Sequence, residues 1–271
     1  MNGPQTPAAC MIHADNDGVA HASPYMSYAG SLVNRSWRTV RDLLFPRGCA
    51  GCDRPDAVLC PQCAALFAQC RRRELIGGAT LGGAPDTRGV PVWSAAVYQG
   101  TVRHAILEWK DHDDVELDAV FAGIMDMLTV RAAVAGRCPA DRPLLVVPAP
   151  SSLQSMRRRG RRHTLPLARA VARSLRAQGI RAEVSPLLTS NASGGRSVQQ
   201  TSSAQRAKRI GGRIVIREKA LQREAPVVLV DDIITTGATL RQCVKALELG
   251  GANVVGALTL ASAVMRDFDL R

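Results

Sequence analysis

The segment VVLVDDIITTGATL, residues 227–240, constrains the fold of this chain more than any other. Four consecutive apolar residues indicate a strand buried on both faces, as at the centre of a parallel sheet. Asp231 and Asp232 follow at the end of this strand, and a loop of threonines and a glycine then leads into a helix with apolar residues on one face. Because ligands of open parallel sheets bind at the carboxyl ends of the strands, the segment predicts both an architecture and the place of a site.

The surrounding sequence alternates between strand and helix patterns. LLVVP (144–148) predicts a strand, LPLARAVARSLRAQG (165–179) a helix and NVVGALTL (253–260) the last strand. Such alternation is typical of an α/β fold with a parallel sheet flanked by helices. Further strands are expected over 92–98 and 213–218, and further helices over 64–70, 101–110 and 115–135.

The loop after the aspartates has the composition of a phosphate-binding turn. Its backbone N–H groups and the positive end of the following helix attract an anion, and a glycine permits close approach. Carboxylates beside phosphate repel it, so we expect Asp231 and Asp232 to accept hydrogen bonds from a ribose diol. The phosphate contacts are expected from Thr235, Thr236, Gly237, Ala238 and Thr239. The alternative is that the aspartates only cap the helix.

Two cysteine pairs, CAGC (49–52) and CPQC (60–63), have the spacing of a zinc site. Four thiolates fill the coordination shell of Zn²⁺, so a structural rather than a catalytic metal is expected. The alternative is a set of reduced core cysteines. The expected ligands are Cys49, Cys52, Cys60 and Cys63, whereas Cys10, Cys70, Cys138 and Cys243 lack a partner at such spacing.

Charge and aromatic content bear on the partners. The net charge of +12 favours phosphate-bearing partners, including single-stranded DNA, and the run MRRRGRRH (156–163) follows a predicted strand. Within that run, His163 is expected at the surface rather than as a general base. No Phe, Tyr or Trp lies between Phe121 and Phe268, which disfavours base stacking in this half of the chain. Stacking would have to come from Trp93, Tyr98 or Trp109.

No apolar run is long enough for a membrane span, and no signal peptide is recognised, so a cytoplasmic protein is expected.

The organisation expected from the sequence has four parts. The parts are a disordered tail (1–30), an amphipathic helix (31–46) with the cysteine module (to residue 70), a Gly-rich linker (71–91) and an α/β domain (92–265).

Residues 227–240 resemble the PRPP-binding signature of type I phosphoribosyltransferases. With the cysteine module and the segments AAVYQGTVRHAILEWK and VVPAPSSLQSMRRRG, the chain over roughly residues 42–260 resembles the ComF family. These are competence-associated bacterial proteins with a zinc module and a phosphoribosyltransferase-like domain. Family members often have Phe-Asn-Gln where this chain has residues 161–163. The matching positions are Tyr98, Gly100, Arg103, Lys110, Pro148, Pro150, Arg159, Gly160 and Arg206.

The resemblance implies a type I phosphoribosyltransferase-like parallel sheet flanked by helices, with a small N-terminal zinc module. It implies PRPP with Mg²⁺ as ligand, and single-stranded DNA and a competence helicase or uptake machinery as partners. Alternatives are a non-catalytic, PRPP-responsive nucleic-acid-binding or scaffold protein, and a nucleobase salvage enzyme. The implied residues are Asp231 and Asp232 at the ribose; Pro148, Ala149, Pro150 and Arg159 at pyrophosphate; and Lys110, Arg103 and Arg206 on the acceptor or nucleic-acid side.

Overall fold

The computed structural model describes seven stretches of the chain. All of them belong to one structural unit, Pro46–Arg271. The predicted tail and the helix predicted over 31–46 lie outside the described residues. The described stretches are 48–76, 89–111, 114–138, 142–151, 161–190, 214–216 and 224–264.

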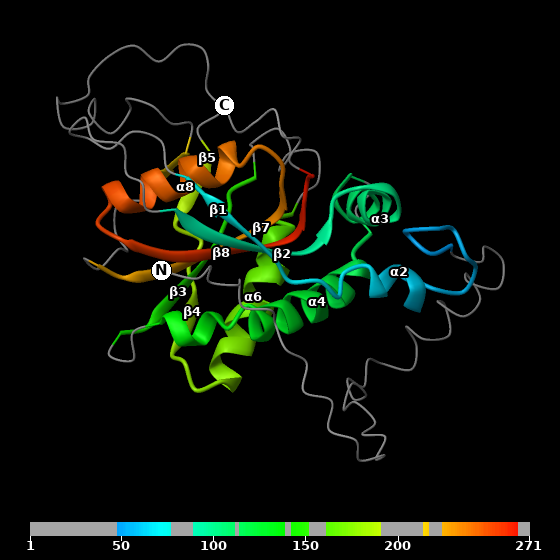
Figure 1. The fold of residues 1–271 in the computed structure, drawn as a ribbon, viewed down its shortest axis with the longest axis horizontal. Coiled ribbons are helices and arrows are strands. Elements are labelled where there is room, and N and C mark those ends of the chain that lie inside the picture. The colour runs from blue at the N-terminus through cyan, green and yellow to red at the C-terminus, as the bar shows by residue number, and fades with distance from the viewer. Residues whose placement is uncertain are drawn as a thin grey trace, which may run out of the picture. The chain divides into compact units, whose positions relative to one another are not determined.

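A six-stranded sheet forms the centre of this unit, with strand order β1-β2-β8-β7-β3-β4 (Figure 1). Only β1 runs antiparallel to its neighbour, and the other five strands are parallel. The α/β fold predicted from the strand–helix alternation is therefore confirmed. The strands are β1 (Arg71–Leu75), β2 (Val90–Val97), β3 (Leu144–Pro148), β4 (Ala182–Val184), β7 (Pro226–Ile234) and β8 (Asn253–Ser262).

Strand β7 lies between β3 and β8 and is covered on both faces. Its residues Val227–Val230 are at most 1% exposed, which is why this stretch reads as a continuous apolar run. Val147 of β3 is in register with Leu229, and Leu229 with Ala257 of β8. The carboxyl ends of these parallel strands consequently meet at one edge of the sheet.

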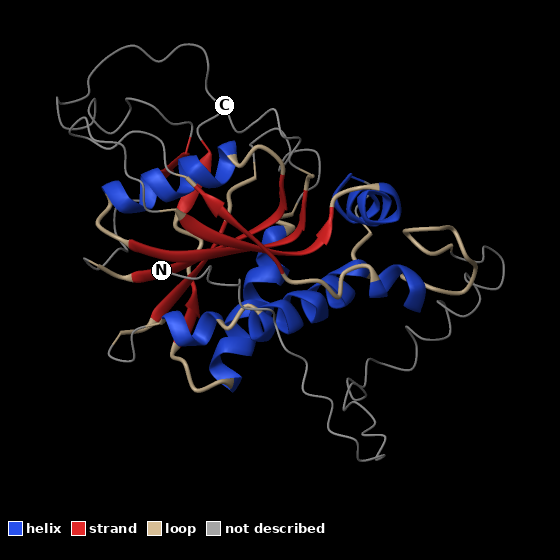
Figure 2. Ribbon diagram, in the orientation of Figure 1, coloured by secondary structure: helices blue, strands red, loops and turns tan. Residues whose placement is uncertain are grey.

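Helices cover both faces of the sheet. Figure 2 shows α8 on one side and α4 and α6 on the other. One face of the sheet packs against α3, α4 and α6. The opposite face packs against α8 and against a separate antiparallel pair of strands, β5 and β6. Among the described residues, no helix combines the length and the apolar character needed to cross a membrane. These elements are α3 (Gly100–Asp111), α4 (Leu117–Arg131), α6 (Thr164–Ala177), α8 (Ala238–Leu249), β5 (Leu188–Ser190) and β6 (Ile214–Ile216).

The start of the predicted linker is a strand. Arg71–Leu75 forms β1 and pairs with β2 along its whole length, whereas the linker was predicted to begin at residue 71. Of its five side chains only Leu75 is buried, and the charged side chains are exposed or half-buried, as is typical of an edge strand. This burial pattern leaves no apolar alternation in the sequence. The Gly-rich residues 77–88 lie outside the described stretches.

The cysteine module packs against the side of the sheet that α3, α4 and α6 cover. Its short helix α2 spans Pro61–Ala65, not 64–70 as predicted. Phe67 is buried against Phe121 of α4, with ring centroids 5.5 Å apart. The amide of Gln69 donates to the carbonyl of Ala95 at 3.0 Å, joining the segment after α2 to β2. The module is thus held by core packing and by backbone hydrogen bonds.

Candidate active site and candidate metal centre

Asp231 and Asp232 lie near the carboxyl end of β7 and are almost fully buried. Their exposed fractions are 8% and 4%. Each carboxylate accepts a hydrogen bond from the next backbone amide: Asp231 Oδ1 from Asp232 at 2.9 Å, and Asp232 Oδ1 from Ile233 at 2.7 Å. Local backbone geometry therefore orients both side chains at the sheet edge.

Asp232 has two further partners from distant parts of the chain. His163 Nε2 lies 2.8 Å from Asp232 Oδ2, and the ammonium of Lys110 contacts the same oxygen. His163 is only 4% exposed, so its predicted surface position is wrong. It directly precedes α6, and a polar residue before a helix gives no sequence signal of burial. Lys110, which was expected on the acceptor or nucleic-acid side, contacts Asp232 in the structure.

The two aspartates have opposite pKa shifts. Burial, followed by the charge of Asp232, raises the pKa of Asp231 well above its usual value. Burial also acts to raise the pKa of Asp232, but the hydrogen bond from His163 and the charge of Lys110 outweigh it and lower the pKa. The charged form is thus stabilised at Asp232 and penalised at Asp231.

A second layer of contacts fixes His163. Its ring meets the edge of Trp109 at a centroid distance of 5.3 Å, and its Nδ1 lies 3.4 Å from Ser151 Oγ. Trp109 Nε1 donates to Asp118 at 2.6 Å, and Arg161 Nη1 donates to both oxygens of Asp118 at 2.7 and 2.8 Å. Asp118 therefore holds Trp109, and through it the ring of His163, in place.

The aromatic residues expected to offer stacking are mostly inaccessible. Trp109 is fully buried and Trp93 is 4% exposed, so neither ring face is open to a base. Tyr98 is half-buried at the end of β2. Two of the three expected stacking partners are therefore excluded.

The loop between β7 and α8 has the expected turn. Gly237 has φ +79°, and the Ala238 amide donates to Thr236 Oγ1 at 3.3 Å. This positive φ favours glycine, and a Cβ here would also force the end of the Leu75 side chain, 2.6 Å away, to shift. From β1, Arg73 donates to the Thr235 carbonyl at 3.1 and 3.2 Å.

A second arginine lies beside this loop. Burial, followed by the charge of Arg241 in the first turn of α8, lowers the pKa of Arg73. The edge strand and α8 thus place two cations beside the turn. Arg73 was not expected at this site, because residue 73 falls in the segment predicted to be a linker.

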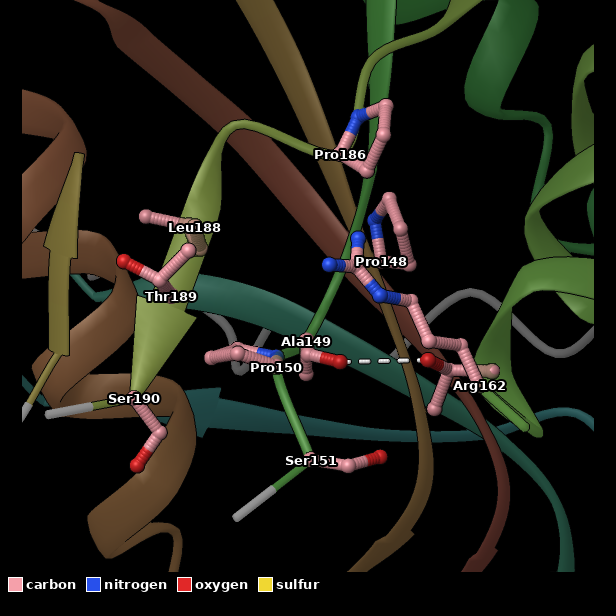
Figure 3. Close-up of a pocket in the computed structure, with 10 residues that line it drawn as sticks. Pro148, Ala149, Pro150, Ser151, Arg162, Pro186, Leu188, Thr189 and Ser190 are labelled. Carbon is pink, nitrogen blue, oxygen red and sulfur yellow. Dashed lines mark hydrogen bonds between the residues drawn. The ribbon is translucent and has the colours of Figure 1, made fainter. Parts of the chain in front are cut away.

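The expected pyrophosphate side borders a pocket. Figure 3 shows Arg162 beside the turn that follows β3, and Thr164 Oγ1 donates to the Ala149 carbonyl at 3.1 Å. Arg159 and Arg206 lie outside the described residues, and Arg103 is exposed on α3. The pocket has a volume of about 180 Å³ and is lined by Pro148, Ala149, Pro150, Ser151, Arg162, Thr164, Pro186, Leu188, Thr189 and Ser190.

The four paired cysteines converge on one point. Their sulfur atoms all lie within 4.8 Å of one another. Tetrahedral Zn–S bonds of about 2.3 Å place sulfurs about 3.8 Å apart, and Sγ of Cys60 lies 3.7 Å from Cys52 and 3.4 Å from Cys63. Cys49, Cys60 and Cys63 are buried and Cys52 is exposed. The cluster therefore fits a four-thiolate metal site.

Backbone amides prepare this cluster for a metal. Burial acts to raise the pKa of the Cys49 thiol, but amide hydrogen bonds, the first from Cys60 at 3.2 Å, outweigh it and lower the pKa to about 6. The thiolate is the form that binds metal, so the backbone amides favour the ligand form of Cys49, whereas burial and the neighbouring thiols raise the pKa of Cys63.

Comparison with known proteins relates the second half of the chain to phosphoribosyltransferases. The family model for the phosphoribosyl transferase domain matches residues 161–267. A 60-residue stretch is 43% identical to orotate phosphoribosyltransferase of Bartonella henselae, covering 22% of this chain and 29% of that protein. This chain thus matches less than a third of the length of that relative.

Two solved structures show distant similarity. UMP synthase of Leishmania donovani is 18% identical, with 74% of this chain and 31% of that chain covered and a TM-score of 0.29. Adenine phosphoribosyltransferase of Thermoanaerobacter pseudethanolicus is 13% identical, with 73% and 98% covered and a TM-score of 0.32. The sequence match over residues 161–267, which includes the acidic pair and its loop, identifies this part of the chain as phosphoribosyltransferase-like.

Proposed function

We propose that the protein binds PRPP at the carboxyl edge of its sheet. The observation that carries this proposal is the buried acidic pair of β7 next to the Gly237 turn. In this proposal the aspartates accept the ribose hydroxyls, and the amides of residues 235–239 hold the 5′-phosphate. Arg73 and Arg241 add positive charge there, while Arg162, Arg159 and the turn at 148–150 serve the pyrophosphate.

Transfer of the phosphoribosyl group would break the bond between C1′ and pyrophosphate and form a bond from C1′ to a nucleophilic atom of the acceptor, with pyrophosphate as the leaving group. The charged Asp232 stabilises positive charge that develops on the ribose, and the arginines stabilise the leaving group. Mg²⁺, if it enters with PRPP, would supply charge neutralisation for the leaving pyrophosphate. Asp232 already contacts Lys110 and His163, so the acidic pair is not expected to hold this ion.

Asp231→Asn is expected to weaken PRPP binding about tenfold to a hundredfold, because an amide replaces a carboxyl oxygen opposite a ribose hydroxyl. Calorimetric titration with PRPP and Mg²⁺ measures this change. Glu183→Gln on β4 is the matched control, since Glu183 is exposed on the far strand of the sheet. Equal affinity of wild type, Asp231→Asn and Glu183→Gln for PRPP would contradict the role of the acidic pair. Asp118 is unsuitable as a control because of its contacts with Trp109 and Arg161.

Beyond PRPP binding, we propose a ComF-like role in handling single-stranded DNA during uptake, in the cytoplasm and together with a competence helicase or uptake machinery. The net charge of +12 and the four-cysteine cluster support this assignment. A non-catalytic, PRPP-responsive binding protein is the second candidate, favoured by the ion pair that already engages Asp232. Release of pyrophosphate with any of a panel of acceptors separates the enzyme from the binder. The burial of Trp93 and Trp109 disfavours nucleobase salvage.

Single-stranded DNA is expected to bind with an affinity that falls steeply as salt rises. Each phosphate neutralised by Lys or Arg contributes about 0.7 to the slope of log K against log salt, so five such contacts weaken binding by roughly a hundredfold between 50 and 200 mM salt. Fluorescence anisotropy with an oligonucleotide measures this slope, and excess PRPP is expected to shift the affinity. A flat salt dependence, or no binding at 50 mM salt, would argue against a DNA-handling role.

A further inference from the structure

The acidic pair is held by an unusual set of donors. Asp232 Oδ2 meets both His163 Nε2, at 2.8 Å, and the Lys110 ammonium, while its Oδ1 accepts from the Ile233 amide at 2.7 Å. An ionised carboxylate offers about four acceptor positions. These donors engage three positions, and the fourth is left to the carboxyl group of the neighbouring Asp231, which also interacts with Asp232, or to a ligand hydroxyl that replaces this contact.

The two distant donors have different roles in this arrangement. Lys110 is a flexible point charge with a side chain that is 25% exposed, so it supplies charge but little direction. His163 has a 5% exposed side chain, and its planar ring is fixed between Trp109 and Ser151. The histidine therefore determines the angle at which Asp232 presents its remaining acceptor position.

The ring of His163 is itself set by several elements. Trp109 belongs to α3, Ser151 follows β3, and His163 precedes α6. Trp109 is anchored in turn by Asp118, which Arg161 also holds. Such a supported arrangement fixes a side chain far more tightly than the single bond between His163 and Asp232 would.

We infer that His163, assisted by Lys110, is a positioning residue that aims Asp232 at a ribose diol and gives the site its preference for ribose over 2-deoxyribose. The inference rests on the proposed ribose 5-phosphate site and adds the residue that sets its sugar selectivity. Ribose has two vicinal O–H donors, which match the open acceptor of Asp232 and the neighbouring Asp231. A 2-deoxyribose has only one of these donors and leaves one acceptor without a partner.

The test is calorimetric titration with ribose 5-phosphate and with 2-deoxyribose 5-phosphate. Wild type is expected to prefer the ribose compound about tenfold or more, which is the loss expected for one hydrogen bond to a charged acceptor. His163→Leu is expected to abolish the preference by weakening ribose 5-phosphate binding only. His163→Gln is expected to restore it, because a glutamine amide donates to Asp232 as the imidazole does. His104→Gln, on the exposed side of α3, is the matched control and keeps the wild-type ratio.

Lys110→Met gives a second measurement that does not depend on the folding of the leucine variant. It is expected to reduce the preference while leaving 2-deoxyribose 5-phosphate binding unchanged. A wild-type ratio in both His163→Leu and Lys110→Met, or an equal loss for both sugars, would overturn the inference while leaving the ribose-phosphate site intact. Wild type that binds neither sugar phosphate nor PRPP would instead contradict the proposed function itself, and the inference with it.

Discussion

Asp232→Asn is expected to lower the free energy of unfolding by about 3 kcal/mol at neutral pH, which is the low end for removing one partner of a buried ion pair. For a chain of this size the loss corresponds to roughly 6–12 °C in Tm. The substitution leaves Lys110 and His163 facing an amide. Asp231→Asn is expected to cost much less, because burial and the neighbouring Asp232 already penalise the charged form of Asp231. The contacts of Asp232 with Lys110 and His163 therefore distinguish the two variants.

The pH dependence of stability is expected to have opposite signs at the two positions. The pKa of Asp232 is lower in the folded protein than in the unfolded chain, so its contribution is present above about pH 4 and is lost as the pH falls. The pKa of Asp231 is raised on folding, so ionisation of this residue destabilises the protein as the pH rises above about 4. Relative to wild type, Asp232→Asn should thus recover at acid pH, and Asp231→Asn should gain as the pH rises.

Urea unfolding followed by circular dichroism from pH 3 to 8 measures both effects, with Glu183→Gln as the exposed control. Equal destabilisation by the two asparagine variants at pH 7 would show that Lys110 and His163 do not distinguish the aspartates. Equal destabilisation by the two asparagine variants at every pH from 3 to 8 would also exclude the opposite pKa shifts of Asp231 and Asp232.

Cys52→Ser is expected to abolish metal binding and to unfold the cysteine module. Structural zinc sites of this kind bind with apparent free energies of about 10–16 kcal/mol at neutral pH, and that free energy is largely folding energy of the module. Loss of the module would also remove the packing of Phe67 against Phe121 of α4. A large fall in Tm is therefore expected together with the loss of the metal.

Elemental analysis of protein purified in reducing buffer is expected to give about one zinc per chain. Cys138→Ser is the matched control, since the Cys138 thiol donates to the Val134 carbonyl at 3.2 Å and a serine hydroxyl can do the same. A metal-free wild type with four reduced thiols would refute the zinc site. Unchanged zinc content in Cys52→Ser would refute the assigned ligand.

The sequence was sufficient for the features that depend on local patterns. The apolar run 227–230 predicts a buried strand because β7 is covered on both faces, and Gly237 predicts the turn because its positive φ favours glycine. The cysteine spacing predicts the cluster because Cys49 and Cys52 are joined by a tight turn and Cys60 and Cys63 lie at the start of helix α2. The loop and the acidic pair could therefore be located from the sequence alone.

The contacts of Asp232 could not be predicted in this way. Lys110 and His163 lie 122 and 69 positions away from Asp232, and only the packing of α3 and α6 on the sheet brings them to it. A buried histidine and an exposed one have the same appearance in a sequence without an apolar pattern around them. For the same reason Arg73, in a strand with three exposed or half-buried arginines, could not be recognised as a neighbour of the phosphate loop.

Strand β1 also determines where the chain can be divided. β2 is buried at seven of its eight positions, and β1 occupies its outer hydrogen-bonding edge from Arg71 to Leu75. A chain that began after the Gly-rich segment would present β2 as an open, apolar sheet edge, which is a template for edge-to-edge aggregation. The arginines of β1 instead leave a charged strand at the margin of the sheet. β1, which follows the cysteine module, thus covers the edge of β2 against aggregation. The structural unit that holds the acidic pair therefore includes the cysteine module.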